Sequence, residues 1–411
     1  MLSLLLILTL YTGPADSTGN NSSVQDTLDV SMIRNHTTYF TLEEFRFVDA
    51  HSLVELAREA QFVMLGEIHN SRRLSEFTSA LMHLLKPQGF EDLVVETGPY
   101  SAKKLETLIE SEEGKEAVSD FYDRYSSNLF RYYVIPFFTG EGDLAMLQKA
   151  HELGYNLTGI DQDFAYSTAF LVEELMKKSN EPLSEDQLNR LEKITSKLYW
   201  WYRRSKLFSS FDLSCNIKNY EPFKQYITSF TNPNKIQQQI IDAITVSLDI
   251  YCLNESGQWS EGNHKRIDYF KSNFNAFYDQ ASGSGTGKLA KAIVKMGSYH
   301  SGRFKSPNGI YDIGNHVARL ADSLGTTSLH LRFLNRYFEG GRDVIGEKNW
   351  SASTRFISVA ERNRWALIDT RELRKQILDN KLVGNRFEMR EIINYDFIII
   401  MPEDVRAVKH Y

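Results

Sequence analysis

The chain has 411 residues, of which 42% are hydrophobic and 12% aromatic, enough to bury one large core or two smaller ones. Its 47 basic and 53 acidic residues are interspersed and give a net charge of −6, which excludes the basic surface expected of a nucleic-acid-binding protein. No segment has 18 uninterrupted apolar residues, so no stable insertion into a membrane is expected.

The first residues form an apolar run over 1–12 that is too short to cross a bilayer as a helix, and small and polar residues follow it. This pattern is typical of a signal peptide, which we predict over residues 1–17, with an uncleaved apolar tail as the alternative. A polar linker rich in Ser, Asn and Thr is predicted over 18–37, with order beginning near Thr38. We therefore expect a secreted or periplasmic protein.

Strand-like and helical segments alternate from residue 38 to the end of the chain. Apolar spacing predicts helices near 53–59, 74–84, after Pro99 and near 144–150. Short apolar runs predict strands at 62–65, 93–95, 157–160, 293–296, 329–333, 365–368 and 397–400. Such alternation indicates an α/β fold, with a largely parallel or mixed central sheet flanked by helices.

Residues from about 180 to 282 differ in character from the rest of the domain predicted over 38–411. They are long polar stretches with apolar residues at helical spacing, such as Ile236 and Ile240, which predicts a helical insertion. The chain's two cysteines, Cys215 and Cys252, fall in this insertion. Neither cysteine lies in a zinc-ligand spacing, so no zinc site is indicated. The sequence leaves two alternatives open, a disulfide between the two cysteines or two free thiols.

Acidic and histidine side chains directly follow four predicted strands, at Glu67 and His69, Glu96, Asp161 and Asp163, and His300. The carboxyl ends of parallel strands meet at one edge of a sheet, where such folds place their ligand site. Any one of these residues alone is more often a helix cap or a satisfied polar group. Their repetition favours a functional site, since clustered carboxylates and imidazoles perturb one another's pKa.

The sequence has no Gly-x-Ser-x-Gly and no His-Glu-x-x-His, and neither cysteine lies in this cluster, so no covalent nucleophile is apparent. Direct attack by water is the alternative, with His69 as general base held by Glu67 or Glu96. His300 and Arg303 are then placed to stabilise or protonate the oxyanion or the leaving group. The same side chains are also suited to a divalent metal that activates water, and both schemes remain open.

Three further side chains at this edge are assigned to substrate binding, namely Arg303, Asp161 and Asp163. We expect a small-molecule substrate. The oligomeric state is left open.

Several short motifs occur in a fixed order between residues 60 and 402. They are Leu65-Gly66-Glu67-Ile68-His69, Glu76-Phe77, Val95-Glu96, Ile135-Pro136-Phe137-Phe138, Gly159-Ile160-Asp161-Gln162-Asp163-Phe164, Lys295-Met296-Gly297 with His300 and Arg303, and Tyr395-Asp396-Phe397. In these motifs the chain resembles the erythromycin esterase-like family. That family belongs to a broader group that also includes haem-binding uptake lipoproteins and Tiki-type metalloproteases.

The resemblance implies a histidine-dependent hydrolase in which Glu67, His69, Glu96 and His300 form the active site. The chain has Gly-Glu-x-His at residues 66–69, as the haem-binding branch does, where the macrolide esterases have Gly-Glu-x-x-His. Hydrolysis of an ester or related acyl bond is the leading interpretation.

Two alternative functions come from the same group. One is a haem- or metal-binding uptake protein, with His69 or Tyr299 holding haem. The other is a metal-dependent peptidase with an ion near Glu67, His69 and His300. No cofactor is assigned from the sequence, and a divalent metal stays open.

Overall fold

The computed structural model describes residues 25–178, 184–283, 289–405 and 408–411. The predicted signal peptide, residues 1–17, lies outside the described residues. Among the described residues, no helix is both long and apolar enough to span a membrane.

Nine strands form the central sheet, in the order β3-β2-β11-β13-β8-β4-β7-β5-β6. All neighbours from β13 to β6 are parallel, whereas β3, β2 and β11 add antiparallel pairs at one edge. The strands are β2 (Thr37–Glu43), β3 (Arg46–Val48), β4 (Phe62–Glu67), β5 (Asp92–Val95), β6 (Asn156–Gly159), β7 (Ala292–Gly297), β8 (Ser328–Asn335), β11 (Trp365–Asp369) and β13 (Phe397–Met401). The α/β fold with a mixed, mostly parallel sheet is confirmed.

Helices cover the sheet and extend beyond it. They are α1 (Val30–Asn35), α2 (His51–Glu59), α3 (Arg72–Leu85), α4 (Pro99–Ile109), α5 (Lys115–Tyr125), α6 (Glu141–Glu152), α7 (Thr168–Lys177), α8 (Glu185–Leu207), α9 (Leu213–Asn219), α10 (Glu221–Thr228), α11 (Lys235–Glu255), α12 (Trp259–Ser282), α13 (Ile313–Ser323), α14 (Thr354–Ile357), α15 (Arg371–Leu378) and α16 (Arg386–Asn394). Smaller elements are η1 (Lys86–Gln88), η2 (Ala165–Ser167), η3 (Glu339–Gly341), η4 (Lys348–Ser353), and the short strands β1 (Asp26–Thr27), β9 (Tyr337–Phe338), β10 (Arg342–Asp343) and β12 (Leu382–Val383).

Strand β4 shows why the sheet needs cover on both faces. All six of its residues are buried, and successive side chains point to opposite faces. Val63 and Leu65 pack into one apolar cluster together with residues of α3, whereas Phe62 and Met64 pack into another with residues of α12 and α13. A continuous apolar run of this kind is typical of a parallel strand between two helical layers.

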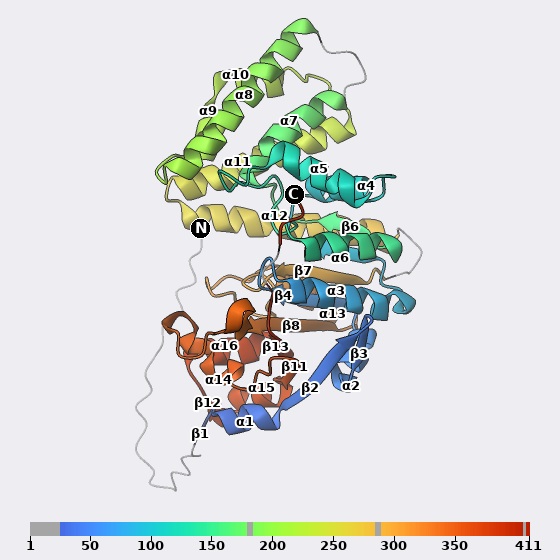
Figure 1. Ribbon diagram of the computed structural model, residues 1–411, viewed down its shortest axis with the longest axis vertical. Helices are drawn as coiled ribbons and strands as arrows, with labels where there is room; N and C mark the ends of the chain where they lie inside the picture. Colours follow the sequence, from blue (N-terminus) through green and yellow to red (C-terminus); the bar gives the residue numbers. More distant parts are fainter. Residues whose placement is uncertain (1–24, 179–183, 284–288, 406–407) are drawn as a thin grey trace, which may run out of the picture.

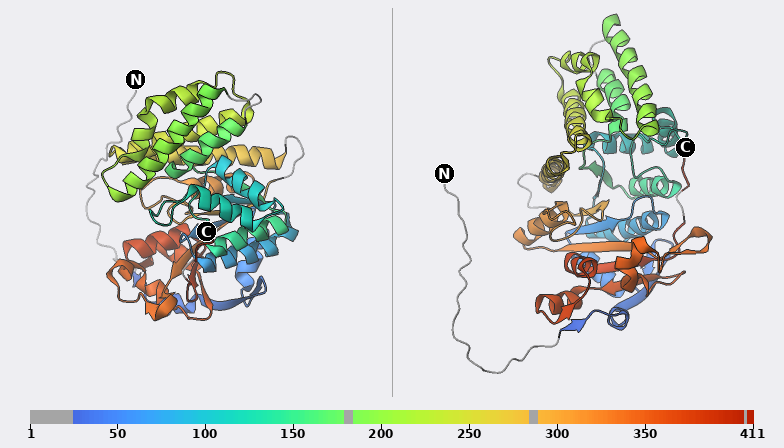
Figure 2. Two further views of the ribbon diagram at one scale, coloured as in Figure 1. Left: turned by 45° about the horizontal axis from the view of Figure 1, so that its top comes forward. Right: turned by 90° about the vertical axis from the view of Figure 1, so that its left-hand side faces the viewer.

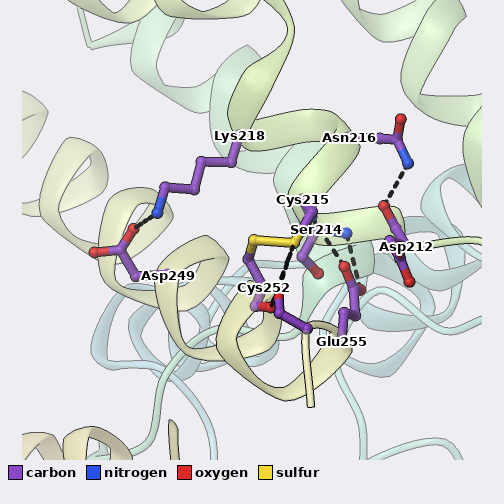
Figure 3. Close-up of a disulfide and its surroundings, with 9 residues drawn as sticks. Asp212, Ser214, Cys215, Asn216, Lys218, Asp249, Cys252 and Glu255 are labelled. Carbon is purple, nitrogen blue, oxygen red and sulfur yellow. Dashed lines mark hydrogen bonds and ion pairs between the residues drawn. A yellow bond between two sulfur atoms is a disulfide. The ribbon is translucent and has the colours of Figure 1, made fainter. Parts of the chain in front are cut away.

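The insertion predicted over 180–282 contains α8 to α12 in its described part. Figures 1 and 2 show α8, α9 and α10 at one end of the molecule, beyond the β6 edge of the sheet. Cys215 on α9 and Cys252 on α11 form a disulfide inside this helical group (Figure 3). Helix α12 packs against the sheet, where Phe270 and Phe274 join the apolar cluster that contains Phe62.

Residues 26 to 36 correct the linker predicted over 18–37. They form β1, which pairs with β12, and α1, which is capped by Asp29 through its Oδ1 atom, 2.8 Å from Met32 N. Leu28 and Ile33 are completely buried in a cluster under β11 and β13. Met32 packs against the same cluster, and burial of these apolar side chains stabilises the segment on the domain.

Candidate active site

The register of the sheet places the predicted site residues at adjacent strand ends. Glu67, the last residue of β4, lies opposite Gly297, the last residue of β7. On the other side of β7, Val95 pairs with Lys295, so Glu96 lies level with Met296, and its Oε2 accepts from the backbone N–H of Gly297. The prediction that several strand ends meet at one edge is therefore correct.

A pocket of about 910 Å³ opens at this edge. Four predicted catalytic residues line it together, namely Glu67, His69, Glu96 and His300. Arg266 of α12 and Phe137 line the same end of the pocket.

The imidazole of His69 is held from two directions. Its Nδ1 lies 3.1 Å from Glu67 Oε1, and its ring stacks on Phe137 with centroids 3.7 Å apart and 13° between the planes. A Cβ built on Gly297 would lie 3.0 Å from His69 Nε2 and 3.1 Å from Glu96 Oε2. Nε2 and the Glu96 carboxylate thus converge over Gly297, where a larger residue would intrude.

Glu67 is an anion that makes His69 more basic. The Lys295 ammonium, itself fully buried, donates to Glu67 Oε2. Burial alone would raise the pKa of Glu67. The charges and hydrogen bonds of Lys295 and His69 outweigh burial and lower this pKa to about 2. Burial lowers the pKa of His69, but the hydrogen bond to Glu67 and the charges of Glu67 and Glu96 raise it above its ordinary value.

Glu96 is the second buried anion of the site. Its Oε1 accepts from Arg266 Nη2 at 2.9 Å and lies 3.8 Å from His300 Nε2, while Oε2 accepts from the backbone N–H of Gly297. Burial raises the pKa of Glu96, but His300 and Arg266 lower it below its ordinary value. Arg266 also binds Asp161, with Nε 3.0 Å from Oδ1 and Nη2 2.6 Å from Oδ2.

His300 is oriented by a carboxylate on the far side of its ring. Its Nδ1 lies 2.8 Å from Asp312 Oδ2, and the other oxygen of Asp312 accepts from the backbone N–H of Ile313 at the start of α13. The ring also contacts Phe270 edge to face, with centroids 5.1 Å apart. The remaining nitrogen, Nε2, is thereby directed toward Glu96 and the pocket.

The residues assigned to substrate binding lie elsewhere. Arg303 binds Asp396 Oδ2 at 2.7 Å, and Asp163 is buried and accepts from Ser101. Burial raises the pKa of Asp163 to about 7, although Ser101 lowers it. Asp161 lies behind Arg266, and none of the three lines the pocket described above. Their positions give no support to direct contact with a substrate.

Four functional side chains were not assigned from the sequence, namely Lys295, Arg266, Asp312 and Phe137. Lys295 carried a signal, because a lysine inside the apolar run 292–297 requires a buried partner for its charge. Arg266 lies in the helical insertion, far in sequence from the strand ends. Asp312 has the sequence pattern of an ordinary helix N-cap. Neither has a sequence pattern that links it to the strand ends.

The ligating atoms of Glu67, His69 and Glu96 lie within 4.8 Å of one another, a set that could hold a metal ion. Each carboxylate, however, already accepts from a cation, Glu67 from Lys295 and Glu96 from Arg266. A divalent ion would add positive charge beside two buried cations. The charge balance therefore fits a proton-transfer site better than a metal centre.

No protein-family model matches the sequence, and no match is found among curated proteins. Among solved structures, a mutant of the erythromycin esterase EreC in its open conformation aligns with a TM-score of 0.56, at 13% identity, over 90% of this chain and 99% of that chain. A Bacillus cereus protein aligns with a TM-score of 0.54, at 14% identity, over 93% and 98% of the two chains. A succinoglycan biosynthesis protein aligns with a TM-score of 0.51, at 14% identity, over 92% and 97%. The chain is therefore similar in fold to an erythromycin esterase over nearly the whole length of both chains.

Proposed function

We propose that the protein is a secreted hydrolase that cleaves an ester or related acyl bond with a water molecule activated by His69. The observation that carries the proposal is the pair formed by Glu67 and His69, whose free Nε2 faces the pocket. A neutral imidazole oriented by a buried carboxylate is the arrangement that general-base catalysis requires.

The proton transfers follow from the two histidines. His69 Nε2 takes a proton from water as the water oxygen bonds to the acyl carbon, and Glu67 stabilises the imidazolium that forms. The acyl oxygen becomes an oxyanion, which Arg266 and a protonated His300 stabilise as hydrogen-bond donors. When the bond to the leaving group breaks, His300 donates a proton to that group, and Asp312 keeps its Nε2–H directed at the pocket.

Two observations support the proposal from outside the site. The fold is similar to that of an esterase. The Cys215–Cys252 disulfide supports export, since disulfides persist mainly in oxidising compartments.

The test compares wild type, His69→Ala and His264→Ala on a panel of chromogenic esters. His264 is an exposed residue of α12 outside the pocket and serves as the matched control. We expect His69→Ala to lower kcat/KM by about 10³-fold with an unchanged melting temperature, and His264→Ala to keep full activity. Full activity in His69→Ala would exclude this mechanism.

The alternative functions predicted from the sequence stay predictions. Elemental analysis and dialysis against a chelator test the metal-dependent peptidase. Stoichiometric divalent metal together with activity lost on chelation would favour it over the proposal. A Soret band on adding haem, lost in variants of His69 or of the exposed Tyr299, would favour haem uptake.

A further inference from the structure

The pocket continues past the two histidines to a second end, which we call the basic arm. It is formed by the segment after His300 together with β8, η4 and α16. Its defining residues are Lys305, Arg332, Trp350, Phe387 and Arg390. The proposed chemistry uses none of them.

The sheet register fixes the arm beside the catalytic strand. Arg332 of β8 lies opposite Gly66 of β4, one residue before Glu67. Neighbouring strands are about 4.8 Å apart, so the backbone of Arg332 lies next to that of the catalytic strand. A single small molecule in the pocket can therefore contact both ends.

The arm carries more positive charge than its own acid neutralises. Arg332 and Arg390 share one carboxylate, with Nε atoms 2.8 Å and 3.0 Å from the two oxygens of the buried Glu391. Lys305 is exposed and has no carboxylate partner among the described residues. Three cations thus face one anion, which leaves a positive surplus that favours an anionic ligand.

Hydrogen-bond donors also remain free in the arm. Arg332 Nη1 donates to the carbonyl of Phe333 at 2.9 Å, while its Nη2 has no partner among the described residues. Both Nη atoms of Arg390 likewise have none. Guanidinium groups with free Nη atoms match the two oxygens of a carboxylate or phosphate.

Aromatic rings lie beside these donors. The Arg390 guanidinium is 5.3 Å from the ring centroid of Phe387, and Trp350 lines the same end of the pocket. Half-buried rings next to a cation favour a flat, apolar group that carries a negative charge.

We propose that the basic arm binds an oxyanion, either a carboxylate or a phosphate, carried on a flat apolar body at the non-reacting end of the substrate. The inference rests on the proposed function for where the scissile ester lies. It adds that the preferred esters are anionic.

The kinetic test uses mono-4-nitrophenyl esters of terephthalic acid and suberic acid, each paired with its methyl ester, which lacks the charge. We expect wild type to show a KM about tenfold lower for the anionic member of at least one pair. Arg390→Gln should abolish that preference, by raising the KM of the anionic ester to that of its methyl ester. Lys348→Gln, which removes an exposed charge of η4 outside the pocket, is the matched control and should keep the preference.

Calorimetric titration with benzoate and phenyl phosphate separates this inference from the proposed function and compares the two oxyanions. We expect binding of at least one of them to weaken about tenfold in Arg390→Gln and to persist in His69→Ala. Such binding without ester turnover would remove the proposed hydrolase and keep the anion site. Ester turnover with equal KM within both pairs, and no binding that depends on Arg390, would overturn the inference.

Discussion

The ring of Phe137 lies parallel to the imidazole of His69, with centroids 3.7 Å apart, and Phe137 holds this position with a backbone φ of +68°. A left-handed backbone at a residue with a Cβ costs about 1–3 kcal/mol. Such strain persists only where the surrounding structure requires it. Here it places a ring against the proposed catalytic base.

Replacement of Phe137 by Ala or by Gly separates the ring from the backbone strain. Both variants lose the stacking, so we expect kcat/KM to fall about tenfold in each as His69 becomes less restrained. The Gly variant should be about 1 kcal/mol more stable than the Ala variant, because glycine adopts positive φ without a Cβ clash. Urea unfolding compares the two, and equal stabilities would show that the backbone at residue 137 is not strained.

The pH dependence of kcat/KM reports the charge state of His69. Its pKa is raised above 6.5, and a general base acts only when deprotonated, so activity should rise with pH through a midpoint above 6.5. Glu67→Gln removes the charge that raises this pKa, so the midpoint should move to lower pH while the maximal rate falls. A midpoint that stays in place would mean that another group titrates.

Lys295→Met leaves Glu67 buried without its cation. We expect a loss of about 3–5 kcal/mol at pH 7, typical of breaking a buried ion pair. In wild type the pKa of Glu67 is lowered to about 2, so its stabilising contribution is complete above about pH 4.5 and is lost as the pH falls toward 2. In the variant, burial raises the pKa of Glu67, so this carboxyl becomes protonated at a higher pH than in wild type. The difference in unfolding free energy between variant and wild type should therefore be smaller at low pH.

Urea unfolding at pH 7 and pH 4 measures both effects of Lys295→Met. The double variant Glu67→Gln/Lys295→Met is the control, because it removes both charges and should recover most of the stability. A double variant as unstable as Lys295→Met would indicate a packing defect at residue 295 rather than an unpaired charge.

Asp312 serves both His300 and the start of α13, and two substitutions distinguish these roles. Asp312→Asn should lower kcat about 100-fold, because a neutral amide no longer stabilises a protonated His300. Asp312→Ala should lose the same activity and in addition about 1 kcal/mol of stability, because the backbone N–H of Ile313 loses its acceptor. Steady-state kinetics and thermal unfolding of both variants measure the difference. Normal turnover by Asp312→Asn would exclude His300 as the proton donor.

The strand ends were predictable because their signals are local. The runs at 62–65, 93–95 and 293–296 are short and, apart from Lys295, apolar, and residues that follow such runs, His69 and Glu96 among them, meet at the sheet edge. The parallel sheet brings them together by register alone. Sequence patterns of this kind carry both the element and its chemistry.

The remaining partners depend on packing between distant segments. Arg303 follows the same strand as His300, yet its guanidinium binds Asp396, the residue before β13. Its backbone N–H is held there by the carbonyl of Asn394, two residues earlier. Arg266 reaches Glu96 only because Phe270 and Phe274 pack α12 against the sheet. The edge strands β2 and β3 were also not predicted, since partly exposed strands lack the continuous apolar run of the central ones.

The contact between Arg266 and Glu96 spans 170 residues of sequence. During synthesis Glu96 leaves the ribosome long before the helix that supplies its guanidinium, and that buried carboxylate lacks this partner until α12 has docked. Closing so long a segment is a late event in folding. The pairing of Glu96 with Arg266 therefore forms only once the helical insertion is in place, and we expect a chain truncated before α12 to lack the proposed activity.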